Sequence, residues 1–200
     1  MFIDRTATVS EELSVLGLNA GHLITVTEVN PSRNLPYHNS HHCLSVGLNA
    51  LEGARVASLG LEDQRTLFLA GLYHDFNHGG GSRCDQENVA DAARNMMAWC
   101  RLLEDFSEEQ LNAIQQAIWA TCWPSELYTG PRTIIEDILC DADLLQWTEP
   151  DTEDFMAGFA REANDGTNWE TTLAFLKKHW PKTEWAQQRV SQWLKEYEQR

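Results

Sequence analysis

The histidines of this chain gather in two short clusters that also contain other groups capable of chemistry. Five of the seven histidines fall in the runs 37–42 (YHNSHH) and 74–78 (HDFNH), and the second run continues into three glycines. Imidazole nitrogens and carboxylate oxygens are common ligands of divalent transition metals. The clustering therefore indicates a metal site more readily than a set of scattered surface histidines.

Spacing within the clusters supports this interpretation. His38 and His42 are four residues apart, as are His74 and His78, and on a helix this spacing places two side chains on one face. The stretch 61–75 is apolar enough to predict a buried helix. A buried Asp75 is costly unless it is paired or bound to a cation. We therefore predict that His74 and Asp75 reach a metal from one helix.

A further carboxylate is needed to complete such a centre. The segment 134–147 (IIEDILCDADLLQW) carries Asp141 and Asp143 among apolar residues, where a carboxylate is again more costly than at the surface. A mixed histidine and carboxylate set suits Zn²⁺, Mn²⁺ or Fe²⁺. A second, more oxygen-rich position would suit Mg²⁺.

The order H…HD…D resembles the HD superfamily of metal-dependent phosphohydrolases. The run 37–42 is similar to the YHNxxH signature of class I cyclic nucleotide phosphodiesterases, and the run 74–80 is similar to their HDxxHxG signature. Ala120-Thr121 and Ala142-Asp143-Leu144 resemble two further landmarks of that family. The resemblance extends over about 37–147, somewhat more than half of the chain.

The resemblance implies a role for each of these residues. The metal-ligand positions fall on His42, His74, Asp75 and Asp143, and Asp143 is preferred to Asp141 because it occupies the Ala-Asp-Leu position. His38 takes the position of the general acid, and His78 a position near the bridging water. One or two divalent ions (Zn, Mn, Fe or Mg) are expected, with Asp75 shared between them. Glu87 is a weaker candidate to support metal-bound waters.

This set of groups suits phosphoester hydrolysis. A divalent ion acidifies water to a pKa of about 7 and neutralises charge on phosphoryl oxygens, while a histidine acid typically contributes 10²–10⁴-fold in rate. The resemblance therefore implies an enzyme, a metal-dependent phosphohydrolase that cleaves a small phosphoester. A cyclic nucleotide-like phosphodiester is the preferred substrate.

Departures from the family keep other functions open. The chain is far shorter than the phosphodiesterase catalytic domains, Cys122 stands where an Asp usually follows the Thr, and neither the ENHH element nor the purine-binding glutamine can be placed. The alternatives are a nucleotide phosphomonoesterase, a non-catalytic nucleotide-binding HD regulator and an HD-type di-iron oxygenase. The oxygenase is disfavoured because no histidine lies between His78 and Asp143.

The elements that must position these residues are predicted to be helices in an all-α, single compact HD-domain bundle. The 200 residues fit one domain, 1–200, with the motif-bearing core at about 37–147 and C-terminal helices at 150–200. Only 22–29 is rich in β-forming residues. Helices are expected at 40–52, 61–75, 85–103, 108–121 and 132–147. Pro124, Gly130 and Pro131 mark a loop, a helix runs from Pro150 to Asn164-Asp165-Gly166, and Pro181 separates two more.

The formal net charge of −15 bears on the partners. Because so acidic a surface repels long nucleic acid, we expect a small phosphoester or nucleotide as the partner instead.

Absence of a signal peptide or a long apolar run predicts a cytoplasmic protein away from membranes. The basic residues Lys177, Lys178 and Lys182 are interpreted as a solvated face, and the late tryptophans as packing or a possible homo-oligomer surface. The five cysteines are expected to be reduced thiols.

Overall fold

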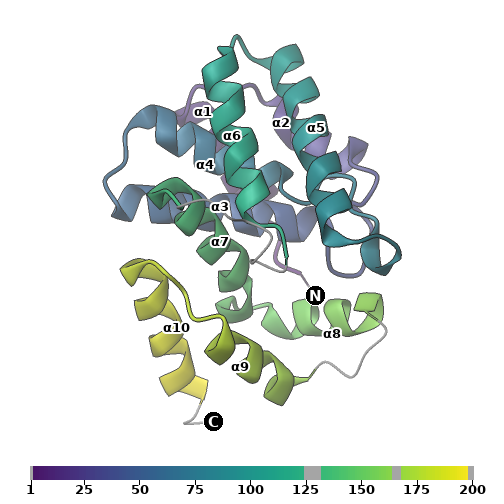
Figure 1. Ribbon diagram of the computed structural model, residues 1–200, viewed down its shortest axis with the longest axis vertical. Coiled ribbons are helices and arrows are strands. Elements are labelled where there is room, and N and C mark those ends of the chain that lie inside the picture. The colour runs from purple at the N-terminus through teal and green to yellow at the C-terminus, as the bar shows by residue number, and fades with distance from the viewer. Residues whose placement is uncertain (1, 124–131, 164–167, 198–200) are drawn as a thin grey trace.

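The computed structural model describes residues 2–123, 132–163 and 168–197. Within these residues the regular elements are all helical, which confirms the predicted all-α fold (Figure 1). The α-helices of the described residues, in chain order, are α1 (Thr6–Val15), α2 (Gly21–Ile24), α3 (Ser40–Val56), α4 (Leu61–Tyr73), α5 (Asp85–Leu103), α6 (Glu108–Ala120), α7 (Ile134–Leu145), α8 (Thr152–Ala163), α9 (Trp169–Lys178) and α10 (Glu184–Tyr197). The β-rich stretch is helical too, since a π-helical turn (Thr25–Val29) continues α2.

The core lies where α3 and α4 pack against α6 and α7. The second half of α4 is buried on all sides, with Leu67, Phe68, Leu69 and Leu72 at 0% exposure. Burying a side chain of this kind contributes roughly 1.5–3 kcal/mol. At the crossing of α3 and α4, a Cβ on Gly71 would lie 2.7 Å from the Cα of Gly47. The two glycines therefore let the helix backbones touch, which brings the two histidine clusters together.

The helix boundaries at the histidines decide which side chains share a helical face. Helix α3 begins at Ser40, as predicted, with the Asn39 side chain accepting from the backbone N–H of His42, so His38 precedes the helix. Helix α4 ends at Tyr73, and Asn77 adopts a positive φ of 64° in the turn that follows. The predicted helix through residue 75 and the two same-face histidine pairs are therefore wrong. Tertiary packing, not helical periodicity, brings these residues together.

Other helix boundaries agree closely with those predicted from the sequence. Helix α5 occupies the predicted range, and α6 begins with the predicted capping box between Ser107 and Gln110. Helix α7 begins with a second capping box, between Thr133 and Glu136. The predicted loop residues 124, 130 and 131 and the helix end at 164–166 lie outside the described residues.

Helices α8, α9 and α10 form a C-terminal layer below α3–α7 in the view of Figure 1. The start of α8 is held by a buried ion pair in which both guanidinium ends of Arg5 contact the carboxylate of Asp151 at 2.9 Å. Asp141 anchors the segment that precedes α10, because its carboxylate accepts from the backbone N–H groups of Lys182 and Thr183. All five cysteines are free thiols. Within the described ranges, no helix is both long and apolar enough to cross a bilayer.

Candidate metal centre

Four donor atoms from three helices converge beside the core. His42 lies in the first turn of α3, His74 and Asp75 lie just past the end of α4, and Asp143 lies on α7. His42 Nε2 lies 3.0 Å from His74 Nε2. Asp75 Oδ2 lies 2.9 and 3.0 Å from these two nitrogens, and Asp143 Oδ1 lies 3.3 and 3.5 Å from them. The structure therefore brings together all four residues that the sequence singled out as ligands.

Hydrogen bonds on the far side of each ring fix which nitrogen faces the cluster. His74 Nδ1 contacts the carbonyl oxygen of Gly71 at 2.8 Å, and His42 Nδ1 contacts Gln146 Oε1 at 2.5 Å. Because these oxygens can only accept, both Nδ1 atoms must carry the proton. The Gln146 amide in turn donates to the hydroxyl of Tyr37. Each ring thus turns Nε2, its remaining nitrogen, towards the other.

This arrangement fits a cation. Two lone pairs and two carboxylates facing one another repel unless positive charge lies between them. A tetrahedral ion with bonds of 2.0–2.1 Å has ligand atoms about 3.3–3.4 Å apart, close to the separations given above. The two histidines are 1% exposed, whereas the Asp143 side chain is 32% exposed and faces solvent. The buried His42, His74 and Asp75 could therefore hold a metal ion, with access from the side of Asp143.

The pKa values of the four residues also indicate a site for a cation. Burial lowers the pKa of His42 and of His74, but hydrogen bonds and charge from Asp75 and Asp143 outweigh it, so both pKa values are raised. Burial would raise the pKa of Asp75 and of Asp143, yet the histidines hold both values below the ordinary range. The cluster therefore stabilises positive charge at its centre, which a divalent cation would supply in place of protons.

A second cluster, formed by His38, His78 and Glu162, adjoins the first. The His38 and His78 rings stack with centroids 3.6 Å apart. Glu162 on α8 lies 2.5 Å from His38 Nδ1 through Oε1, and its Oε2 accepts from the backbone N–H groups of Tyr37 and His38. This contact requires α8 to lie against the segment before α3. Gly158 permits it, because a Cβ there would collide with the carbonyl oxygen of Pro36.

His78 is held from both sides in this second cluster. The backbone N–H of Gly80 donates to His78 Nδ1 at 3.0 Å, and the Asn88 amide lies 2.9 Å from Nε2. Burial lowers the pKa of His78 to about 4, so the ring is neutral at neutral pH. Glu87 is exposed and has no part in this contact, whereas its neighbour Asn88 is buried against His78.

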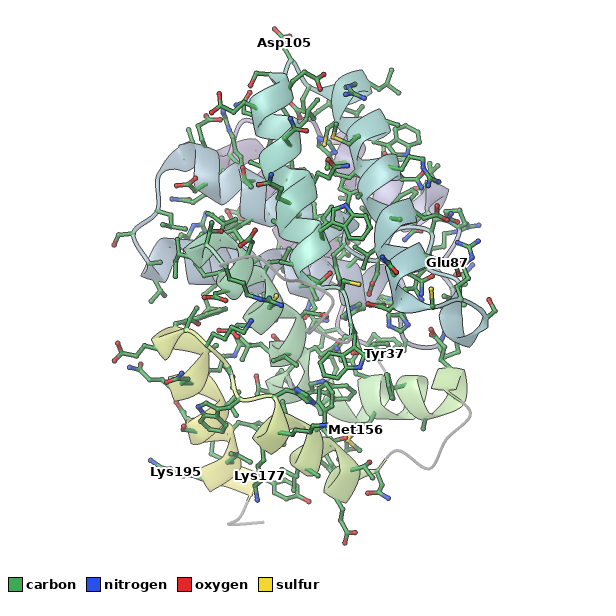
Figure 2. All side chains as sticks on the ribbon, in the orientation of Figure 1. Tyr37, Glu87, Asp105, Met156, Lys177 and Lys195 are labelled. Atoms are coloured by element: carbon green, nitrogen blue, oxygen red, sulfur yellow. The ribbon has the colours of Figure 1, made fainter. Side chains whose placement is uncertain are left out.

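Both clusters border one cleft of about 620 Å³. Tyr37, labelled in Figure 2, lies on its wall beside α8. The rest of the lining comes from the segment before α3, the turn after α4, and helices α5 to α9, and it includes His38, Asp75, His78, Asp143, Phe159 and Lys178. A ligand in this cleft would therefore reach the two histidine clusters together.

The remaining candidates have structural contacts. Asp141 is 1% exposed and binds backbone N–H groups before α10 rather than the ligand cluster. His41 stacks on Phe2, and His22 is buried between Tyr73 and Glu104. Sequence reasoning missed Gln146 and Glu162. Gln146 lay within the Asp143 segment as a polar residue between apolar ones, whereas Glu162 gave no local signal.

No protein-family model matches the chain, and no curated protein matches it.

Proposed function

We propose that this protein is a metal-dependent phosphohydrolase of the HD type that cleaves a small phosphoester. A cyclic nucleotide-like phosphodiester is the preferred substrate, on the strength of the motif resemblance. One observation carries the proposal. His42 and His74 each commit Nδ1 to a carbonyl oxygen and turn Nε2 towards Asp75 and Asp143, beside a cleft that His38, held by Glu162, also borders.

His42, His74, Asp75 and Asp143 would hold the metal. A bound divalent ion supplies positive charge to the phosphoryl oxygens and makes water acidic enough to attack near neutral pH. Tyr37 and Gln146 support this set from behind, because the Tyr37–Gln146–His42 chain of hydrogen bonds fixes the orientation of the His42 ring. Such supporting contacts typically alter metal affinity or activity by 10–100-fold.

His38 is the proposed general acid. Its Nδ1 is bonded to Glu162, which leaves Nε2 as the ring nitrogen that can give a proton to the leaving oxygen. The Glu162 carboxylate accepts from Nδ1 and fixes the angle of the ring. His78 stacks on His38 but stays neutral, so it adds no positive charge beside the proposed donor. His38 is therefore the proposed proton donor of the pair.

The test combines elemental analysis with turnover of a phosphoester panel. The panel contains cyclic nucleotides, nucleoside monophosphates and a nitrophenyl diester, and two aspartates two residues apart are compared. Asp143→Asn should lose bound metal and turnover together, because one ligand charge is removed. Asp141→Asn should keep the metal, because its carboxylate binds backbone N–H groups instead. Equal metal loss in both variants would show that the ligand set is wrong.

The panel also separates the competing functions. Release of phosphate from monoesters alone would identify a phosphomonoesterase. Strict dependence on iron with consumption of oxygen would indicate an oxygenase. A metal-loaded protein that binds nucleotides but turns over no phosphoester, the nitrophenyl diester included, would refute the hydrolase proposal and identify a regulator.

A further inference from the structure

The cleft concentrates positive charge in a strongly acidic chain. The formal net charge is −15, with only 15 lysines and arginines. Four of these cations line the cleft, namely Arg83, Arg132, Lys178 and Lys182, beside four carboxylates, Asp75, Asp85, Asp141 and Asp143. Asp75 and Asp143 are two of the proposed metal ligands, so a bound divalent ion would make the lining net positive. This local field favours an anion in a protein that otherwise repels anions.

Two of these cations lie close to the metal centre. Cys140 precedes Asp143 by three residues on α7, which is a rise of about 4.5 Å. Arg132 Nη1 lies 2.5 Å from Cys140 Sγ. The backbone N–H of Lys182 is bound to Asp141, the residue between Cys140 and Ala142. The charges of Arg132 and Lys182 both act to lower the pKa of the Cys140 thiol, against the effect of burial. Arg132 and Lys182 therefore border α7 within about one turn of Asp143.

Lys178 approaches the same lining from the end of α9. It is exposed, and within the described residues no ion pair involves it, whereas Lys182 Nζ lies 3.5 Å from Asp137. Its neighbour Lys177 carries the same charge but lies outside the lining. In Figure 2 the labelled Lys177 lies at the lower edge of the molecule, away from the labelled Tyr37. Lys177 therefore serves as a matched control for Lys178.

A simple cyclic phosphodiester has one negative charge, which the metal centre can neutralise alone. Arg132, Lys178 and Lys182 together exceed what such a substrate requires. We propose that Arg132, Lys178 and Lys182 form a subsite for a second phosphate group, so the ligands of this cleft are small phosphoesters with at least two phosphates. This proposal rests on the proposed function for its first phosphate position, which is the metal centre.

The first experiment measures binding without catalysis. Inorganic pyrophosphate is titrated calorimetrically into the full-length protein after removal of metal by chelation. Lys178→Gln should weaken binding by about five- to tenfold, and the wild-type affinity should fall steeply with salt. Lys177→Gln should bind as the wild type does. Equal affinities of both variants for pyrophosphate would overturn the subsite.

The second experiment uses two substrates with the same scissile bond. Adenosine 2′,3′-cyclic phosphate is compared with its 5′-phosphorylated form in the metal-loaded enzyme. The wild type should prefer the 5′-phosphorylated form, and Lys178→Gln should reduce that preference about five- to tenfold, through KM. Lys177→Gln should retain the preference.

The two experiments distinguish failure of the subsite from failure of the proposed function. Pyrophosphate binding that depends on Lys178, in a protein that hydrolyses nothing, would support the subsite and refute the hydrolase. Hydrolysis of both substrates at equal efficiency, with the two lysine variants alike, would overturn the subsite and leave the hydrolase standing.

Discussion

The two histidine clusters differ in how their rings are held. In the ligand cluster, His42 and His74 are almost fully buried, and their outward nitrogens bind groups on α4 and just after α7. In the second cluster, the His38 side chain is 21% exposed and is held by a carboxylate 124 residues away on α8. One cluster is thus built into the central bundle, while the other forms only where the C-terminal layer docks.

This difference assigns separate physical requirements to metal binding and to proton transfer. Metal binding depends on the packing of α3, α4 and α7, and the touching backbones of Gly47 and Gly71 set the crossing of α3 with α4. Orientation of His38 depends on Glu162, and so on the contact of α8 with the segment before α3. Substitutions should therefore separate the two functions.

The largest loss of metal and of turnover is expected from a substitution in the ligand cluster. His42→Ala removes a nitrogen within 3.0 Å of His74 Nε2 and should abolish stoichiometric metal, with turnover reduced by more than about 10³-fold. His41→Ala is the matched control, because the adjacent ring stacks on Phe2 instead. Elemental analysis and steady-state kinetics provide the measurements, and circular dichroism checks the fold. Metal loss in the His41 variant as well would remove the distinction between the two histidines.

His38→Gln should separate the clusters most clearly. The variant loses the proposed proton donor but none of the four ligands, so turnover should fall by about 10²–10⁴-fold with metal content unchanged. A substrate with an activated leaving group, such as a nitrophenyl ester, needs less protonation and should be affected less. The comparison of leaving groups is the decisive measurement. An equal loss on both substrates would mean that His38 does not act as the acid.

Substitutions in the Arg5–Asp151 ion pair, which anchors the start of α8, test whether metal binding is independent of the docking of α8. Arg5→Met leaves the buried Asp151 carboxylate without its cation and should lower the free energy of unfolding by about 3 kcal/mol. The double variant Arg5→Met/Asp151→Leu should recover most of that loss. Metal content should stay at the wild-type level in both. Chemical denaturation and elemental analysis check these outcomes, and loss of metal on release of Arg5 would show that the clusters are not independent.

The same ion pair gives a pH dependence. Burial would raise the pKa of Asp151, but Arg5 and the backbone N–H of Ile3 outweigh it, so the pKa lies below its ordinary value. A carboxyl with a lowered pKa adds stability above its unfolded pKa of about 3.9, and that stability is lost as the pH falls below it. Asp151→Asn should remove this part of the acid dependence, measured as denaturant midpoints between pH 6 and 3. An unchanged slope would show that Asp151 contributes nothing to it.

Features that depend on neighbouring residues could be predicted from the sequence, whereas features that depend on contacts between distant residues could not. The fold class and most helix boundaries depend on local patterns, such as the capping boxes at Ser107 and Thr133. The ligands were also found locally, because His42, His74 and Asp75 fall in short polar runs beside apolar helices. The start of α3 at Ser40 was also predicted, but the end of α4 at Tyr73 and the turn at Asn77 that follows it were missed.

Glu162 could not be predicted in the same way. It lies on an amphipathic helix among other charged residues, and nothing within ten positions marks it as functional. Its role depends on the close approach of Gly158 to Pro36, a contact across more than a hundred residues. Gln146 is an intermediate case, because a polar side chain at 1% exposure after an apolar helix requires a partner, but the sequence does not identify His42 as that partner.

The smallest effect is expected from Glu162, and it distinguishes positioning from plain stability. Glu162→Gln can keep an acceptor for the backbone N–H groups of Tyr37 and His38, but its amide N–H₂ would then oppose the Nδ1 proton of His38. Turnover should fall about tenfold with metal retained, a size expected from a slightly misplaced group.

The leaving group supplies the second readout for Glu162→Gln. If Glu162 orients His38 towards the leaving oxygen, the loss of turnover should be larger on an ordinary phosphoester than on a nitrophenyl ester, which needs less protonation. A substitution that only loosened α8 would lower both rates alike. Glu153→Gln, an exposed change on the same helix, is the matched control. Equal losses on the two substrates in Glu162→Gln would place Glu162 among the residues that merely hold α8, and the second cluster would then reduce to its two histidines.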